Sequence, residues 1–323
     1  MKPLLEAISR LRILVVGDAI LDHYIFGDAN RISPEAPVPV VDVERDSWTA
    51  GGSANVAINL TALGAKAELI GLIGRDSAGQ QTQSILKERG VDFDTRFISD
   101  NAPTILKTRV VVRNQQLCRI DREGSPSRYR LELEKHRDAI AAKVRAANAV
   151  IVSDYAKGLL TEELVAFIKA EAHAAGIFIA CDPKPKRKLD FSGFDLITPN
   201  RSESLLMAQL DLHSHDAFPA EAICRGIHQR FSPKLLIVTL GPDGMLISRE
   251  GRMIKQLPTF AREVYDVSGA GDTAVATLTA ALATGASDEE AAHFANTASG
   301  VVVGKFGTAT ATPAEILAYH QGH

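Results

Sequence analysis

Residues 149–181 read AVIVSDYAKGLLTEELVAFIKAEAHAAGIFIAC. Residues 149–153 and 177–181 are short and almost wholly apolar, as expected for strands that have no solvent-facing side. Between them, residues 161–175 carry apolar side chains at helical spacing, and Gly176 follows as a stop signal. Strand, helix and strand in this order predict two buried parallel strands joined by a helix.

The same alternation runs through much of the chain. No repeat, low-complexity tract or clear linker interrupts it, so residues 1–323 are expected to form one domain. Strands this apolar need cover on both sides, which predicts an α/β fold with a mostly parallel sheet between two layers of helices. Further strands are expected at 11–17, 67–73, 195–198 and 235–240, and further helices at 53–63 and 77–89.

Two segments depart from this alternation. Residues 38–43 carry apolar side chains at alternate positions, and residues 105–120 resemble a hairpin that turns near 114–116. Together they predict a small antiparallel sheet that projects from the domain, with one apolar face. Because an exposed apolar face is usually covered, we expect a homodimer through this sheet. In the first hairpin strand Leu106, Val110 and Val112 share one face, whereas Lys107, Arg109, Val111 and Arg113 share the other.

The composition excludes several classes of protein. Charged residues make up 23% of the chain and the net charge is −3, which favours neither nucleic acid nor an anionic membrane as a partner. The three cysteines are an odd number without metal-binding spacing, which argues for a reducing compartment. The apolar run near the N-terminus is too short to span a membrane and lacks a cleavage site. A cytoplasmic protein is therefore expected.

Residues 265–273, YDVSGAGDT, precede an apolar helical run at 274–283. Gly269 and Gly271 let backbone N–H groups approach a ligand, and a helix N-terminus favours an anion. A carboxylate beside an anion is unfavourable unless it acts on another group, so Asp272 is a candidate general base facing a hydroxyl. The alternatives are a plain helix start, where acidic residues are common, and a dinucleotide-binding turn. The second alternative is weak, because no acidic residue follows at a strand end.

Candidate ligand contacts lie at the strand ends, because ligands of parallel sheets bind beyond their carboxyl ends. Gly51 and Gly52 precede a helix with Asn55 in its first turn, an arrangement typical of either a cap or a polyol contact. Asn200 and Glu203 form either a plain cap or a site that holds Mg²⁺ through water. The residues expected at the strand ends are Asp18, Asp154, Asp182, Asn200 and Gly241.

The most basic segment, residues 182–188 (DPKPKRK), also follows an expected strand. Such charge runs are usually solvated surface, but the prolines limit flexibility and would hold Lys184 near the sheet edge, where it could contact phosphate. The chain lacks the motif G-x-x-x-x-G-K-[ST], so a kinase with this sequence would not be of the P-loop kind.

Four motifs occur in order along nearly the whole chain: Gly51-Gly52 with Asn55, Thr198-Pro199-Asn200 with Glu203, Thr239-Leu240-Gly241 with Gly244, and residues 266–272. Together they resemble the ribokinase-like (PfkB) family of sugar kinases. This resemblance implies a three-layer sandwich whose projecting sheet is a lid, formed by about residues 23–50 and 103–122, that often pairs two subunits. Further segments look like the heptose 7-phosphate kinase branch: Gly17-Asp18 with Asp22, residues 33–37, Ser153-Asp154-Tyr155 with Lys157-Gly158, and Asp182-Pro183-Lys184.

The resemblance also implies a role for each matching position. Asp272 is implied to be the general base, and in some family members a monovalent cation such as K⁺ binds beside the residue equivalent to Asp266. The implied anion hole for the transferred phosphoryl group is made by the N–H groups of Gly269, Ala270 and Gly271. The implied sugar contacts are Asp18, Asp22, Gly51, Gly52 and Asn55. The implied contacts of ATP are Asn200 and Glu203, which organise Mg²⁺ through water, with Thr239, Gly241, Gly244, Asn296, Lys305 and Gly307.

Members of this branch phosphorylate the anomeric hydroxyl of D-glycero-β-D-manno-heptose 7-phosphate, in the pathway to the ADP-heptose of lipopolysaccharide cores. Many are fused to a nucleotidyltransferase domain; the chain ends at His323 without room for one, so adenylyl transfer is expected to fall to another protein. The alternatives are a kinase for another sugar, such as fructose or ribose, an inactive nucleotide-binding regulator, and a dinucleotide-dependent oxidoreductase. The candidate cations for the 7-phosphate are Arg109, Arg113, Lys157, Lys184 and Lys186.

Overall fold

The computed structural model describes residues 1–113, 115–185, 189–211, 217–261 and 264–321. Its main sheet has the strand order β15-β14-β13-β12-β11-β10-β1-β4-β6. All pairings from β13 to β6 are parallel, and β14 and β15 add an antiparallel edge. The strands are β1 (Arg12–Gly17), β4 (Lys66–Ile70), β6 (Val91–Phe93), β10 (Ala149–Ser153), β11 (Phe178–Asp182), β12 (Leu196–Ile197), β13 (Leu235–Thr239), β14 (Met245–Arg249) and β15 (Arg252–Leu257).

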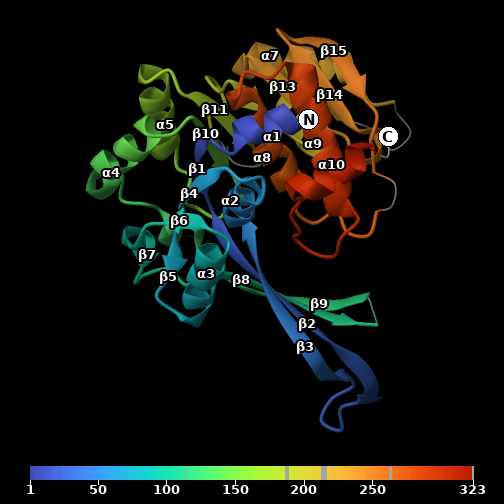
Figure 1. The fold of residues 1–323 in the computed structure, drawn as a ribbon. Helices are drawn as coiled ribbons and strands as arrows, with labels where there is room; N and C mark the ends of the chain where they lie inside the picture. Colours follow the sequence, from blue (N-terminus) through green and yellow to red (C-terminus); the bar gives the residue numbers. More distant parts are fainter. Residues whose placement is uncertain (114, 186–188, 212–216, 262–263, 322–323) are drawn as a thin grey trace.

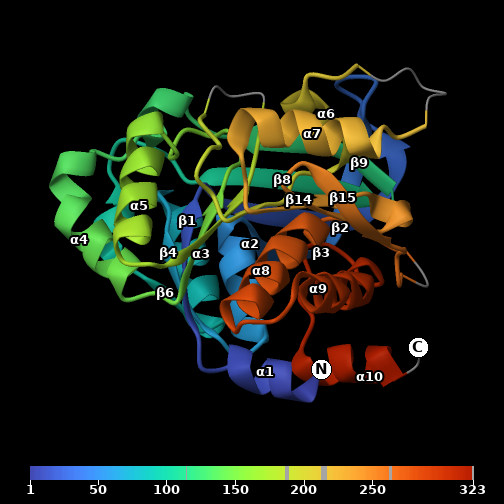
Figure 2. The same ribbon diagram turned by 90° about the horizontal axis from the view of Figure 1, so that it is seen from above.

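Helices cover both faces of this sheet, as seen from above in Figure 2. Along β1, Ile13 and Val15 pack into one apolar cluster and Leu14 and Val16 into the other, because successive side chains of a strand point to opposite faces. The predicted three-layer α/β fold is confirmed. The first layer holds α1 (Lys2–Ile8), α2 (Ser53–Ala62), α3 (Ser77–Glu88), α8 (Ala270–Ala283), α9 (Asp288–Val303) and α10 (Pro313–Gln321); the second holds α4 (Leu133–Arg145), α5 (Glu162–Ala174), α6 (Arg201–Ala208) and α7 (Ala220–Phe231).

A second, smaller sheet projects from the main body (Figure 1). We call it the lid sheet; its strand order is β3-β2-β8-β9. Its two outer pairings are antiparallel, as predicted, but the central pair, β2 and β8, runs parallel. Both central strands start in the buried core, at Ile20 and Ile105, and run outward, so they share a direction. The strands are β2 (Ala19–Ile32), β3 (Pro39–Gly52), β8 (Ile105–Val112) and β9 (Gln115–Arg122).

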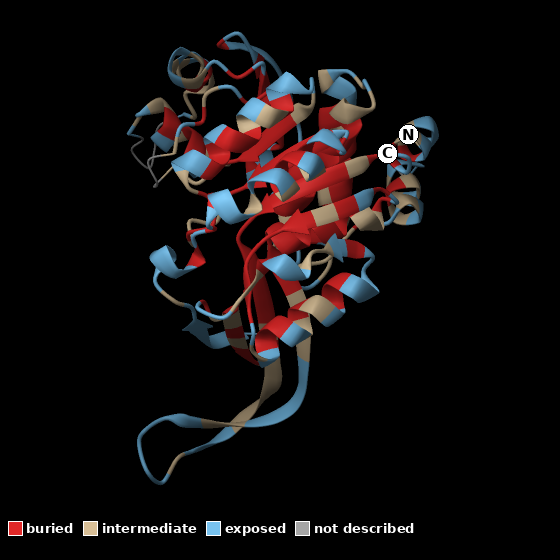
Figure 3. Cartoon of the chain, turned by 90° about the vertical axis from the view of Figure 1, so that its left-hand side faces the viewer, coloured by how far each residue is buried: buried red, intermediate tan, exposed pale blue. Residues whose placement is uncertain are grey.

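Burial differs sharply between the two sheets (Figure 3). The main sheet is buried along nearly all of its parallel strands, whereas the outer part of the lid sheet is exposed. The expected strand 67–73 is divided, because β4 ends at Ile70 and β5 (Ile73–Gly74) pairs instead with β7 (Ile98–Ser99). All three cysteines are free. Within the part of the chain that the structure describes, no helix is long and apolar enough to cross a membrane.

Candidate active site

The carboxyl ends of the central strands lie side by side. The registers of β1, β10 and β11 align Gly17 with Ser153 and Ser153 with Asp182. A bridge between Asn200 and Thr239 continues this edge toward β13. The polar residues expected at the strand ends are therefore neighbours, and the site can be built from them.

Asp272 lies in the first turn of α8 and is almost buried, with 8% of its surface exposed. The side-chain amide of Asn55 donates a hydrogen bond to its Oδ2 (2.7 Å), and the hydroxyl of Tyr155 donates one to its Oδ1. Burial raises the pKa of Asp272 above its ordinary value, and the two hydrogen bonds oppose this shift. The structure thus presents a carboxylate whose proton affinity is increased, as a general base requires.

Tyr155 was not among the predicted contacts. It follows Asp154 in the loop after β10. Its position just beyond a strand end, and its place in the segment Ser153-Asp154-Tyr155, are the signals in the sequence that could have pointed to it. Burial, followed by the charge of Asp272, raises the pKa of Tyr155 well above its ordinary value. The phenol therefore stays protonated and acts as a donor.

Gly269 caps α8 with a left-handed backbone (φ 79°). A Cβ atom at this position would lie 2.8 Å from the amide nitrogen of Asn55, so a larger residue would displace that side chain from Asp272. Ala270 donates its N–H to the carbonyl of Val267 (3.2 Å), whereas no hydrogen bond between described residues uses the N–H groups of Gly269 or Gly271. The start of α8 can offer these donors to an anion.

Asn59, also not predicted, fixes Asn55. Its amide donates to the backbone carbonyl of Asn55 (2.9 Å), and its own carbonyl accepts from the hydroxyl of Thr273 (2.9 Å). These hydrogen bonds link α2 to α8 through a network of buried polar side chains that lie on one face of α2.

Asp22 is buried at the base of the lid sheet and accepts a hydrogen bond from Arg109 (2.5 Å). A Cβ atom on Gly51 would lie 2.1 Å from the Oδ2 of Asp22, so only glycine leaves room for this carboxylate. Gly52 pairs with Ala19 at the start of the same sheet. The lid sheet therefore brings together three of the residues expected to contact the sugar, Asp22, Gly51 and Gly52.

Asp18 accepts three backbone hydrogen bonds, from the N–H groups of Tyr155 (3.3 Å), Lys157 (3.0 Å) and Leu159 (3.0 Å). Only 2% of its surface is exposed. These bonds give Asp18 a role in holding loop 155–159, and through that loop it places Tyr155 and Lys157 at the site.

A cavity of about 810 Å³ opens beside the start of α8. Its volume lies within the range of small-molecule sites, and its lining is mostly apolar with a few polar groups. The cavity brings together most of the residues expected to contact the nucleotide with the helix start that carries Asp272. These are Asn200, Thr239, Gly241, Gly244, Asn296, Ala270 and Gly271.

Lys305 and Gly307 are not part of that lining. The ammonium of Lys305 binds the carbonyl of Thr310 (2.7 Å) and the carboxylate of Glu315 (2.6 Å). The N–H of Gly307 binds Asp266 (2.9 Å), which also accepts from the N–H of Ser268 (2.9 Å). Burial would raise the pKa of Asp266, but these hydrogen bonds lower it. Asp266 thus joins the glycine turn to Gly307, and Lys305 joins the segment around Gly307 to the start of α10.

Asn200 and Glu203 form a capping box at the start of α6. The Oδ1 of Asn200 accepts from the N–H of Glu203 (2.9 Å), and the Oε2 of Glu203 accepts from the N–H of Asn200 (2.9 Å). Lys184 pairs with the remaining oxygen of Glu203, and burial raises the pKa of nearby Asp182. Among the described residues, no group of three His, Cys, Asp or Glu could hold a metal ion. The side-chain oxygens of Asn200 and Glu203 are of the kind that a hydrated Mg²⁺ takes together with phosphate oxygens, and in this structure they are engaged in the capping box and by Lys184.

The other candidate cations occupy different places. Arg113 binds Asp28 (2.9 Å) and Asn30 (2.7 Å) on the exposed part of the lid sheet, and Lys157 binds Glu123 (2.6 Å). Lys186 lies outside the described residues.

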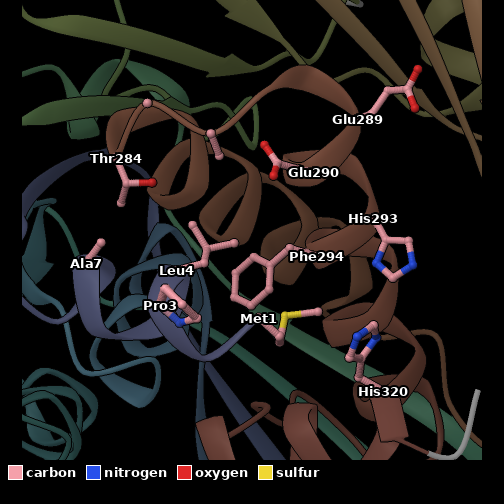
Figure 4. Close-up of a pocket in the computed structure, with 12 residues that line it drawn as sticks. Met1, Pro3, Leu4, Ala7, Thr284, Glu289, Glu290, His293, Phe294 and His320 are labelled. Atoms are coloured by element: carbon pink, nitrogen blue, oxygen red, sulfur yellow. The ribbon is translucent and has the colours of Figure 1, made fainter.

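A second cavity, of about 550 Å³, lies between α1, α9 and α10 (Figure 4). Leu4 and Phe294 give it an apolar floor, and Glu289, His293 and His320 lie at its side. It contains none of the residues predicted for catalysis or binding, so we place the active site at the α8 cavity.

Comparison with known proteins identifies the family of the chain. The family model for "pfkB family carbohydrate kinase" matches residues 10–315. A protein named "Bifunctional protein HldE" from Helicobacter pylori strain J99 is 43% identical over 314 residues, covering 97% of this chain and 67% of that protein. Its namesake from Sulfurimonas denitrificans is 39% identical over 308 residues, covering 95% and 64%. The chain therefore spans about two thirds of the length of these relatives.

The fold comparison agrees. The structure of Arabidopsis thaliana ribokinase, complexed with ribose and ATP, superposes with a TM-score of 0.76 at 20% identity, covering 96% of this chain and 98% of that one. At this identity the likeness shows the ribokinase-like fold. Since the family model spans most of the chain and the relatives agree over nearly all of it, the chain belongs to the pfkB family of carbohydrate kinases and is a sugar kinase.

Proposed function

We propose that this kinase uses ATP and Mg²⁺ to phosphorylate the anomeric 1-hydroxyl of D-glycero-β-D-manno-heptose 7-phosphate, giving the 1,7-bisphosphate. One observation carries the reaction type: Asp272 is held by Asn55 and Tyr155 at an anion-binding helix start, beside a nucleotide-sized cavity. The acceptor is supported by the branch-specific motifs and by the HldE-named relatives, which are 39–43% identical. The product would serve ADP-heptose and lipopolysaccharide core biosynthesis in the cytoplasm.

In the proposed reaction the acceptor oxygen forms a bond to the γ-phosphorus of ATP while the bond from that phosphorus to the β,γ-bridging oxygen breaks. Asp272 takes the hydroxyl proton, and ADP leaves. The free N–H groups at the start of α8 stabilise the negative charge of the transferred group. Asn200 and Glu203 would hold Mg²⁺, which supplies positive charge to the phosphate oxygens.

We also propose that two subunits pair through the lid sheet. Its outer part exposes large apolar side chains that a monomer would leave in contact with water. These are Ile32, Val38, Val43, Leu117 and Ile120.

A substrate panel tests the proposal. Purified protein is incubated with ATP, Mg²⁺ and one acceptor at a time: heptose 7-phosphate, heptose, fructose, fructose 6-phosphate and ribose. We expect turnover to be greatest with heptose 7-phosphate. Preference for fructose or ribose would assign the chain to another branch of the family, and no turnover with any sugar would favour an inactive regulator.

A further inference from the structure

Lys107 differs from the other half-buried lysines of the described chain. Each of the others has a carboxylate partner within 4 Å: Lys143, Lys157, Lys169, Lys184 and Lys305 pair with Glu68, Glu123, Asp190, Glu203 and Glu315. No hydrogen bond or ion pair between described residues involves the ammonium of Lys107. A half-buried charge without a partner is costly, so a site that keeps one calls for a ligand of opposite charge.

The surroundings of Lys107 carry further positive charge. Burial and then the charge of Lys157 lower the pKa of Lys107, and Arg119 acts in the same direction. The charges of Asp22 and Asp121 oppose this shift. Lys157 is paired with Glu123, and Arg119 with Asp121 (2.8 Å), so among these three cations Lys107 is the one without an ion-pair partner. Two ammonium groups that repel each other in one place favour a doubly charged anion between them.

This cluster adjoins the expected sugar site. On the lid sheet, Lys107 in β8 is the Cα partner of Asp22 in β2, and the charge of Asp22 acts on both Lys107 and Asp272. Lys157 lies in loop 155–159, and its backbone N–H donates a hydrogen bond to the carboxylate of Asp18. Asp22 is therefore close enough to both the general base and Lys107 to act on each, as expected if one acceptor molecule extends across them.

The other candidate cations are placed differently. Arg109 binds Asp22, itself an expected sugar contact, and Lys184 binds Glu203 on the nucleotide side. Arg113 binds Asp28 and Asn30 on the exposed part of the lid sheet.

We propose that Lys107 and Lys157 form the binding site for a phosphate monoester carried by the acceptor sugar, at the end remote from the hydroxyl that faces Asp272. This inference rests on the proposed sugar-kinase function and assigns the residues that would hold the phosphate of its acceptor, between the lid sheet and loop 155–159. Near neutral pH such a phosphate carries close to two negative charges, which match the two ammonium groups.

The test compares wild type with Lys107→Met, which keeps the length of the side chain but removes its charge, and with Lys107→Arg, which restores the charge. Lys169→Met is the matched control, because Lys169 is a half-buried lysine on α5 that pairs with Asp190 away from the site. Thermal unfolding establishes that each variant folds, and steady-state kinetics give KM for heptose 7-phosphate, for unphosphorylated heptose and for ATP.

We expect Lys107→Met to raise KM for heptose 7-phosphate by about 10- to 100-fold, the effect of losing a charged hydrogen bond. KM for ATP and for unphosphorylated heptose should stay unchanged, Lys107→Arg should recover most of the affinity, and Lys169→Met should match wild type. An unchanged KM for the 7-phosphate in Lys107→Met would overturn the site while leaving the sugar-kinase function intact.

Calorimetric titration with inorganic phosphate separates the two proposals. Phosphate binding by wild type that Lys107→Met weakens supports the anion site even if heptose 7-phosphate proves not to be the acceptor. Equal binding by both proteins, or no binding by wild type, counts against the site whatever the kinetic panel shows.

Discussion

The hydroxyl of Tyr155 donates a hydrogen bond to the Oδ1 of Asp272, joining the loop after β10 to the first turn of α8. Since Asn55 binds the other carboxylate oxygen, both oxygens of the proposed base are held. Three backbone hydrogen bonds to Asp18 hold the loop that carries the phenol. The orientation of the carboxylate is thus set by two side chains that the fold itself fixes.

Tyr155→Phe removes only the hydroxyl. The base acts when ionised, so activity falls as the pH drops through the pKa of Asp272, which burial has raised. The Tyr155 hydrogen bond lowers that pKa, so its loss should move the acidic limb of the kcat profile to higher pH and reduce kcat near neutral pH by about 10-fold. Tyr319→Phe, which loses a hydroxyl bond to the carbonyl of Phe260, is the control. An acidic limb that does not move would show that Tyr155 does not tune the base.

Gly51→Ala places a methyl group against Asp22. The new Cβ atom would lie 2.1 Å from Oδ2 and must push the carboxylate away from Arg109, which should raise KM for the sugar by about 10-fold and leave KM for ATP unchanged. The φ angle of Gly51 is not positive, so alanine can adopt the same backbone conformation and a change in KM reports the contact with Asp22. Steady-state kinetics measure both constants, and an unchanged sugar KM would remove Asp22 from the acceptor site.

Glu203→Gln separates the charge of Glu203 from its capping role, since glutamine also completes a capping box. Loss of the charge should raise the Mg²⁺ concentration needed for half-maximal activity. It also removes the carboxylate partner of Lys184, so the melting temperature should fall as well. Glu290→Gln is the matched control, because Glu290 closes an equivalent capping box with Ser287 on α9. Equal Mg²⁺ dependence in both variants would contradict the role of Glu203.

Ile120→Glu tests the proposed lid dimer. Ile120 is 58% exposed on the lid sheet, and a charge there should convert a dimer to a monomer in light scattering after size-exclusion chromatography. Ile254→Glu, at a residue 56% exposed on β15, should leave the assembly unchanged. A wild-type monomer, or a dimer that resists Ile120→Glu, would contradict pairing through this sheet.

The main fold could be predicted from the sequence because its strands are buried on both sides. The runs at 149–153 and 177–181 are almost wholly apolar, so their pattern is clear without any tertiary information. β2 was missed, since Asp22, His23 and Asp28 interrupt the alternation expected of a strand. These polar side chains within β2 are the reason that the lid sheet was predicted only in part.

The sequence predicted those parts of the candidate site whose residues are neighbours in the chain. The glycine turn and Asp272 are adjacent in the chain, so a motif reveals them. The bond from Tyr155 spans 117 positions and that from Asn55 spans 217, and neither pairing leaves a local pattern. That Lys107 has no ion-pair partner among the described residues likewise becomes visible only when the partners of the other half-buried lysines are known.

The most direct test of the proposed mechanism is turnover by Asp272→Asn, measured together with ATP binding. Asparagine keeps the size of the side chain but cannot accept the acceptor proton, so kcat should fall by about 10²-fold or more while calorimetry shows unchanged ATP affinity. Near-normal turnover by a folded Asp272→Asn protein would contradict the assignment of Asp272 as the general base.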